Sequence, residues 1–292
     1  SNRGEYSLSS QGCILNATVV VVQGTRLVVR GERRDVAVRP TIKPSYDADF
    51  RAGLFSDDLQ LTDRFRLFLV KGELHLEFVR LQGGLHAPMS GAAIRSLYSK
   101  SSSRDPSMKP FGGEKCETTG WMLCSGNQVY VGDGLMGFSG KVSTLNVTDS
   151  ILSDAGDSEK DDDFTLGGSI AALAAVPKVA VVVLTWTSIM RNYAGVGGGI
   201  FASGARLEFR GAKNTVRDNT VGNRFLSGAQ IMNYNCTVEF TECPPGKYFD
   251  RPLPFTNDVP LIGCPNDCEA GKVAFASAKR VDDCPNCRSG YY

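Results

Sequence analysis

The chain has 292 residues, with 32 lysines and arginines against 31 aspartates and glutamates, and a formal net charge of +1. This length is sufficient for one long domain and a small module. The nearly neutral balance gives no support for a nucleic-acid-binding protein, whose surface would be basic. Residues 1–10 show no signal-peptide pattern.

The first predicted strands lie in residues 18–31, TVVVVQGTRLVVRG, as two short apolar runs around a glycine turn. The stretches VAVRPTI and RFRLFLVKGELHLEF predict further strands. Basic residues gather in this part of the chain, at Arg26, Arg30, Arg33, Arg34 and Arg39. On alternating strands they predict a solvated face, and the alternative is a surface for a sulfated or carboxylated polysaccharide.

Four segments then repeat one pattern, in which an apolar–polar–apolar triplet is followed after a short polar step by another apolar residue. The triplets are Leu74/Leu76, Leu145/Val147, Val183/Thr185 and Leu207/Phe209, and the later apolar residues are Leu81, Leu152, Met190 and Val216. Each segment continues to a turn of small residues ending in isoleucine, at Ile94, Ile170, Ile200 or Ile231. One such unit cannot bury its own apolar face, so we expect the units to stack with these residues inward.

Polar residues at the predicted bends, Asp154, Asn192 and Asn219, suit left-handed backbone or hydrogen bonds to the local backbone. The glycine triplet at Gly197–Gly199 allows two interpretations, a phosphate-binding loop or a tight turn. No Lys-Ser/Thr pair and no amphipathic helix follows it, and Leu207–Phe209 alternates as a strand would. The pattern favours the tight turn.

The strand triplets, the asparagine bends and the Gly-Gly-Ile turns resemble the right-handed parallel β-helix of pectin-lyase-like proteins. They are especially similar to the repeats of polymorphic outer membrane proteins and related adhesins. The resemblance covers about residues 18–240. It implies an all-β fold, with a right-handed parallel β-helix (solenoid) over residues 1–240 and an inserted cysteine-bearing loop at about 99–128. The expected core residues are Leu145, Val147, Leu152, Ile170, Leu207, Phe209, Val216 and Ile231.

The most apolar run, residues 169–190, is long enough to cross a bilayer but carries Pro177 and Lys178 in its middle. The repeat register assigns this run to a turn, a corner and the next strand. We therefore expect no membrane span within the chain. The sequence leaves open whether a membrane tether lies outside it.

Six of the nine cysteines lie from Cys236 onward. The unit CPPGKY at Cys243 is echoed by CEAGKV at Cys268 and CRSGYY at Cys287. These echoes resemble the cysteine-rich repeats of ephrin-receptor-like and tumour-necrosis-factor-receptor-like ectodomains, which implies a small disulfide-rich module over residues 241–292. The resemblance implies the pairs Cys243–Cys264 and Cys268–Cys284, with the partner of Cys287 beyond Tyr292. The alternative is a zinc site of four thiolates from CPNDC and CPNC.

Two further observations favour an extracellular or cell-surface protein. Cys116 and Cys124 bracket a short stretch of the inserted loop and are expected to close it by a disulfide, whereas Cys13 and Cys236 have no assigned partner. N-glycosylation sequons occur at Asn16, Asn146 and Asn235.

Catalytic residues are not apparent. The only histidines are His75 and His86, and His75 is expected to point outward between Leu74 and Leu76. The strands carry Arg26, Arg30 and Arg80, but we find no acidic ladder that would partner them at one site. One acidic cluster, formed by Asp154, Asp157, Asp161, Asp162 and Asp163, predicts a flexible solvated loop and lacks the spacing of a Ca²⁺ loop; weak Ca²⁺ binding is the alternative.

We therefore expect no catalytic residue, cofactor or metal. The sequence favours a non-catalytic extracellular or cell-surface protein, a fragment of a larger one, that contacts a glycan, matrix or protein surface and binds no nucleic acid. The alternative is a divergent polysaccharide lyase, epimerase or hydrolase of the same fold, which would need acidic and basic residues together on one face.

Overall fold

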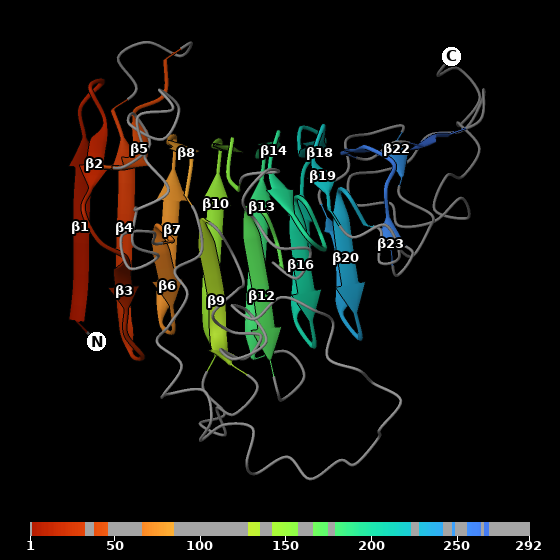
Figure 1. Ribbon diagram of the computed structural model, residues 1–292, viewed down its shortest axis with the longest axis horizontal. Coiled ribbons are helices and arrows are strands. Elements are labelled where there is room, and N and C mark those ends of the chain that lie inside the picture. Colours follow the sequence, from red (N-terminus) through yellow and green to blue (C-terminus); the bar gives the residue numbers. More distant parts are fainter. Residues whose placement is uncertain are drawn as a thin grey trace, which may run out of the picture.

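The computed structural model describes residues 2–32, 38–45, 66–84, 128–134, 142–156, 166–174, 179–222, 228–241, 247–248, 256–263 and 266–268. Strands are the only regular elements in these ranges. They form three seven-stranded sheets, called A, B and C here, which the chain visits in turn along a coil. Figure 1 shows the successive coils side by side along the longest axis, from the N-terminal strands to the C-terminal ones.

Each sheet is a stack of strands from successive coils. Sheet A contains β1 (Asn2–Leu8), β4 (Thr25–Gly31), β7 (Glu73–Glu77), β10 (Ser143–Thr148), β13 (Ala180–Thr185), β17 (Arg206–Arg210) and β21 (Thr237–Thr241). Sheet B contains β2 (Cys13–Leu15), β5 (Thr41–Pro44), β8 (Arg80–Gln82), β11 (Ile151–Ser153), β14 (Ser188–Met190), β18 (Thr215–Arg217) and β24 (Leu261–Ile262). Sheet C contains β3 (Val19–Val21), β6 (Phe68–Val70), β9 (Val129–Gly134), β12 (Ile170–Ala174), β16 (Ile200–Ser203), β20 (Ile231–Tyr234) and β23 (Thr256–Asn257).

Neighbouring strands in these sheets are parallel, except that β23 and β24 pair antiparallel with β20 and β18. Two short pairs lie outside the sheets: β15 (Tyr193–Ala194) is parallel to β19 (Thr220–Val221), and β22 (Lys247–Tyr248) is antiparallel to β25 (Asn266–Asp267). The all-β class is confirmed, and the stacked parallel sheets are consistent with the predicted solenoid.

The core consists of rows of apolar residues that run from coil to coil. In sheet A one row joins Leu27, Leu74, Leu145, Val182 and Leu207, and the next joins Val29, Leu76, Val147, Leu184, Phe209 and Phe240. The eight predicted core residues are all at most 1% exposed, so their burial is confirmed. Alternate residues of a strand point to opposite faces, which places the intervening residues outside.

The predicted alignment of the third repeat is wrong by one residue. Val182 and Leu184, rather than Val183 and Thr185, stand in register with Leu145 and Val147. Likewise Ile189, rather than Met190, pairs with Leu152. Because β13 reads AVVVLT, its alternation carries no contrast between inward and outward positions, and a one-residue shift reverses every side chain.

The isoleucine row in sheet C also differs at its first member. Ile170, Ile200 and Ile231 are in register, but Val129 of β9 holds the position before them. Ile94, which was assigned to that position, lies outside the described residues.

Sheet C is apolar on both faces, which the sequence pattern did not predict. Its outward face carries a second buried cluster that contains Tyr130, Leu166, Ala171, Leu173, Val196, Phe201 and Met232. Buried outward residues in β12 and a mostly apolar β13 explain the long apolar run at residues 169–190. Within the described ranges, no helix is long and apolar enough to span a membrane.

The C-terminal end of the solenoid is covered by strands from the segment assigned to the cysteine-rich module. Leu261 of β24 lies opposite Val216 and belongs to the main core, at 5% exposed. In sheet A, Phe240 stacks on Phe209 with ring centroids 4.9 Å apart and an interplanar angle of 11°. The last coil therefore has apolar partners on the side away from the repeats.

Candidate functional site

The outward face of sheet A carries two clusters of paired charges. In the N-terminal cluster, Arg30 lies 2.6 Å from Glu77 and 3.1 Å from Glu5. Glu73 lies 3.8 Å from Arg26 and 2.5 Å from His75. His75 points outward as predicted, although its side chain is only 16% exposed. These contacts join three adjacent strands, β1, β4 and β7, across the surface.

The C-terminal cluster is centred on Glu208, whose side chain is 8% exposed. Its carboxylate lies 2.7 Å from Arg210 and 3.3 Å from Arg206, and Arg206 also lies 2.8 Å from Glu239. The hydrogen bond from Arg210 is the main cause that lowers the pKa of Glu208; burial opposes it, and the positive charges of Arg210 and Arg206 reinforce it. Glu208 therefore stays ionised at neutral pH.

Between the two clusters the same face is uncharged. The outward residues of β10 and β13, named the uncharged strip here, are Thr144, Asn146, Thr148, Val181, Val183 and Thr185. Asn146 lies 3.3 Å from His75 at the border with the N-terminal cluster. Trp186, which follows β13 with φ of 51°, is 50% exposed at the end of the strip. Hydroxyl and amide groups on a flat face, beside an exposed indole, can offer hydrogen bonds and apolar contact to an extended ligand.

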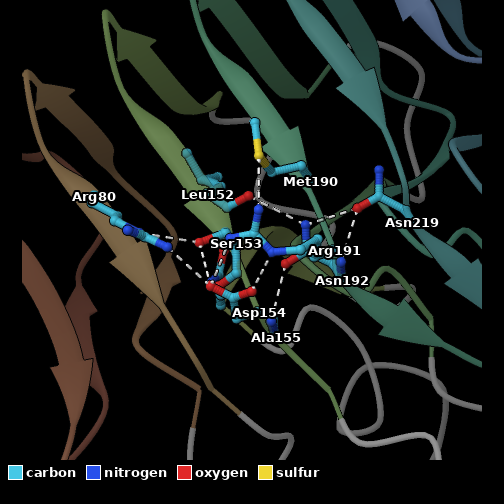
Figure 2. A network of polar contacts seen from close by, with 10 residues as sticks. Arg80, Leu152, Ser153, Asp154, Ala155, Met190, Arg191, Asn192 and Asn219 are labelled. Carbon is cyan, nitrogen blue, oxygen red and sulfur yellow. Dashed lines mark hydrogen bonds and ion pairs between the residues drawn. The ribbon is translucent and has the colours of Figure 1, made fainter.

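A third polar cluster lies where sheet B turns toward sheet C (Figure 2). Asp154 accepts hydrogen bonds from Arg191 at 2.8 and 3.2 Å, from Arg80 at 3.2 Å and from Ser153 at 2.8 Å. Burial alone would raise the pKa of Asp154, but the hydrogen bonds from Arg191 and Ser153 and the charges of both arginines together lower it. Its carboxylate oxygens are thus occupied by protein donors.

Next to Asp154, buried amides connect successive coils. The Oδ1 atom of Asn192 accepts from the backbone of Ala155 at 3.1 Å, and that of Asn219 accepts from the Asn192 backbone and side chain at 3.0 and 2.9 Å. Gln230 accepts from Asn219 at 2.9 Å and donates in turn to the Asp258 carbonyl oxygen at 3.5 Å. Asp154 has the left-handed backbone predicted for a bend, whereas Asn192 and Asn219 act through their hydrogen bonds.

The glycine triplet forms a tight turn packed between coils. Gly197 has φ of 66°, which favours glycine. A Cβ atom on Gly199 would lie 2.5 Å from the Gln230 carbonyl oxygen, and one on Gly198 would meet the Thr220 carbonyl oxygen. Backbone of the neighbouring coil fills the space that a phosphate would need, which agrees with the tight-turn interpretation.

Each strand arginine has an acidic partner that the sequence pattern did not reveal, although the pairs lie at two separate places and not at one site. Arg26 pairs with Glu73, Arg30 with Glu77 and Arg80 with Asp154. The partners lie 47 residues apart for Arg30 and 74 for Arg80, so only the correct strand register would have revealed them.

Arg39 is held at the corner between sheets A and B. Its Nη2 lies 2.5 Å from the Asp149 carboxylate, and its guanidinium lies 5.1 Å from the ring centroid of Phe78. Arg33 and Arg34, the remaining members of the basic group, lie outside the described residues.

The three sequons occupy different settings. Asn16 is exposed at a bend after β2, and Asn235 is exposed at the corner before β21 with φ of 52°. Asn146 is half-buried inside β10, which has a strand on either side.

Few of the cysteines and acidic residues that the sequence indicated can be placed. Cys13 and Cys236 are free, burial raises the pKa of the Cys236 thiol, and Cys268 is disulfide-bonded. No disulfide joins two described cysteines. Of the residues discussed from the sequence, the following lie outside the described ranges: Cys116, Cys124, Cys243, Cys264, Cys284, Cys287, His86, Asp157, Asp161, Asp162 and Asp163. Among the described side chains, no group of three His, Cys, Asp or Glu residues could hold a metal ion.

Comparison with known proteins gives no relative: no family model, no curated protein and no solved structure matches the chain.

Proposed function

We propose that this chain is a non-catalytic extracellular or cell-surface protein, a right-handed parallel β-helix that contacts glycans, matrix or other proteins in adhesion. The observation that carries the proposal is the outward face of sheet A. Its uncharged strip is bordered by two clusters in which each carboxylate already has a cationic or imidazole partner. Such a face can bind an extended ligand through hydroxyl and amide groups without breaking a strong ion pair.

The same electrostatics argue for contact rather than turnover. A general acid of a glycosidase needs a raised pKa, so that it can hold a proton at the working pH. Asp154 and Glu208 have lowered pKa values, because arginines donate hydrogen bonds to them. They are suited to holding the surface rigid and poorly suited to donating a proton.

The extracellular assignment is supported by the exposed sequons at Asn16 and Asn235 and by the disulfide of Cys268. We assign glycans to the exposed sequons at Asn16 and Asn235, and none to Asn146, since a glycan there would cover the uncharged strip. We also assign the disulfides Cys116–Cys124, Cys243–Cys264 and Cys268–Cys284, the last two within ephrin-receptor-like repeats.

The test uses the full chain expressed through a secretory pathway and probed against immobilised neutral glycans, acidic glycans and matrix proteins. Thr144→Lys places a charge in the uncharged strip, and Ser188→Lys is the matched control on the outward face of sheet B, since both positions are half-buried in internal strands. We expect Thr144→Lys to weaken binding by about tenfold or more and Ser188→Lys to leave it unchanged.

Incubation with pectate or alginate, with and without Ca²⁺, is expected to yield no unsaturated product by ultraviolet absorbance. A signal that is lost in the triple variant Asp161→Asn, Asp162→Asn and Asp163→Asn would overturn the proposal in favour of a lyase. Equal loss of ligand binding in both lysine variants would show that the contact surface is not confined to sheet A, and would contradict the proposal.

A further inference from the structure

The corner between sheets A and B contains a row of residues with left-handed backbone. The members of the row, each directly after a strand of sheet A, are Phe78, Asp149, Trp186 and Gly211, with φ of 53°, 46°, 51° and 76°. The register of the preceding strands sets them side by side in successive coils. Bulky side chains rarely adopt this backbone, so Phe78 and Trp186 are the unexpected members of the row.

These two aromatic residues differ in what covers them. Phe78 is 1% exposed and lies under the Arg39 guanidinium, whose carbon is 5.1 Å from the ring centroid. Trp186 is 50% exposed, and among the described residues its indole has no aromatic, cationic or hydrogen-bonding partner. The same corner position therefore carries one covered ring and one large ring that a ligand can reach.

The exposed indole of Trp186 is held in place by its surroundings. Its pyrrole edge lies over Gly211, where an added Cβ atom would be 2.6 Å from Nε1 and 3.0 Å from Cδ1. The next residue, Thr187, donates from its backbone to the buried Asn214 side chain at 3.0 Å and from its hydroxyl to the Thr185 carbonyl oxygen at 3.1 Å. Left-handed backbone at a non-glycine residue persists where the surrounding structure fixes it, and such residues cluster at binding sites.

Hydroxyl groups flank the indole on both sheets. On sheet A, Thr148 and Thr185 are neighbours at the end of the uncharged strip that meets the corner. On sheet B, Ser188 is the first residue of β14, and its hydroxyl accepts from Thr215 at 2.9 Å. The strip follows two six-residue strands, which extend about 20 Å at the rise of a β-strand. Together with Trp186 it forms one elongated uncharged surface.

The charges beside this surface are already paired. At the corner Arg39 binds the Asp149 carboxylate, and on the next strand Arg210 binds Glu208. A carboxylated or sulfated polymer would have to compete with these carboxylates for the arginines. A neutral sugar needs only hydroxyl or amide partners and an apolar surface for the C–H face of its ring, and both are present here.

We propose that the ligand of this face is a neutral, unbranched glycan that lies along the uncharged strip and stacks one sugar ring on the indole of Trp186. Thr148 and Thr185 exchange hydrogen bonds with its hydroxyl groups. The inference rests on the contact function proposed for the outward face of sheet A. It adds the class of ligand and the residue at which a sugar ring binds.

Tryptophan fluorescence tests the stacking directly. The chain has two tryptophans, so Trp121→Phe leaves Trp186 as the only indole. We titrate this full-length variant with three neutral hexasaccharides, cellohexaose, mannohexaose and maltohexaose, and with the acidic hexamer of galacturonic acid. For at least one neutral sugar we expect a saturable change in emission and weaker quenching by acrylamide, because the bound ring covers the indole. The acidic hexamer is expected to bind about tenfold more weakly or less.

Removal of the indole tests its contribution to affinity. Asparagine tolerates left-handed backbone, so Trp186→Asn removes the ring without adding backbone strain. We expect it to weaken binding of the neutral hexasaccharide by about tenfold or more, as measured by calorimetry. Tyr234→Asn is the matched control, because Tyr234 is similarly exposed, at 58%, on sheet C, and it should bind as the wild type does. Circular dichroism and thermal melting verify that both variants are folded.

Comparison with Thr144→Lys separates this inference from the function on which it rests. Binding that is lost in Thr144→Lys but intact in Trp186→Asn would overturn the stacking role and leave the contact face in place. Binding of a matrix protein but of none of the neutral hexasaccharides, or tighter binding of the acidic hexamer, would overturn the ligand class. Binding that is indifferent to both substitutions would contradict the contact face itself.

Discussion

One core row of sheet A is exposed at the N-terminal end of the solenoid and buried at the C-terminal end. Tyr6 and Phe240 end the same row of sheet A, but Tyr6 is 62% exposed and Phe240 is 6% exposed. At the C-terminal end the ring of Phe240 packs on Phe209, and β23 and β24 cover the neighbouring sheets. The repeat therefore builds the core but does not close it. Closure requires residues outside the repeat, as is general for stacked repeats.

The largest expected effect comes from an interior member of this row. Phe209→Asp is expected to lower the free energy of unfolding by about 4 kcal/mol or more, because an unpaired carboxylate would be buried among apolar side chains. Urea denaturation followed by circular dichroism measures it. A loss below about 1 kcal/mol would show that position 209 is not part of a packed interior.

Truncation at the two ends compares them directly. Phe240→Ala is expected to cost about 3 kcal/mol, since it removes a stacked ring and leaves a cavity. Tyr6→Ala is expected to cost under about 0.5 kcal/mol, because the Tyr6 side chain is largely exposed. Equal losses in the same denaturation assay would show that Tyr6 and Phe240 contribute equally to the free energy of unfolding.

The amide ladder beside the closed end should have an intermediate effect. Asn219→Ala removes the acceptor for the Asn192 backbone and side chain, both buried, and is expected to cost about 2 kcal/mol. Lys213→Ala, an exposed residue of the same coil, is the control. If both variants melt at the wild-type temperature, the ladder does not join the coils.

A small effect concerns the surface and acts through pH. The pKa values of Asp154 and Glu208 are lowered in the folded chain, so their contribution to stability is complete above the unfolded value of about 4 and is lost as pH falls through the lowered folded value. Asp154→Asn is expected to cost at most about 1 kcal/mol at neutral pH. Its loss of stability on acidification should be shallower than that of the wild type, as measured by melting temperature across pH. A steeper loss would contradict the lowered pKa of Asp154 in the folded chain.

Much of the solenoid could be predicted from the sequence, because strands such as β10 and β17 alternate clearly between apolar and polar residues. The predicted register was wrong at β13, where Val181 to Leu184 are all apolar and both faces look alike. The burial of outward residues on sheet C was not predicted for the same reason, since the pattern cannot show which of two apolar faces is the interior.

The candidate site was less predictable. Arg80 and Asp154, or Arg30 and Glu77, become neighbours only through pairing between coils, so a one-dimensional pattern does not show them. The covering strands β23 and β24 have two residues each, too few to show a period. What the sequence did indicate correctly near the site is local: the bend at Asp154 and the turn at Gly197.

Hydrogen exchange by mass spectrometry tests the contrast between the ends most directly. The comparison is between β3 and β20, the first and last parallel strands of sheet C, in the wild-type chain. We predict rapid exchange at the edge amides of β3 and protection at Ile231 and Met232 of β20, which have strand partners on both sides. Equal protection of the two strands, or faster exchange in β20, would contradict an open N-terminal end and a closed C-terminal end.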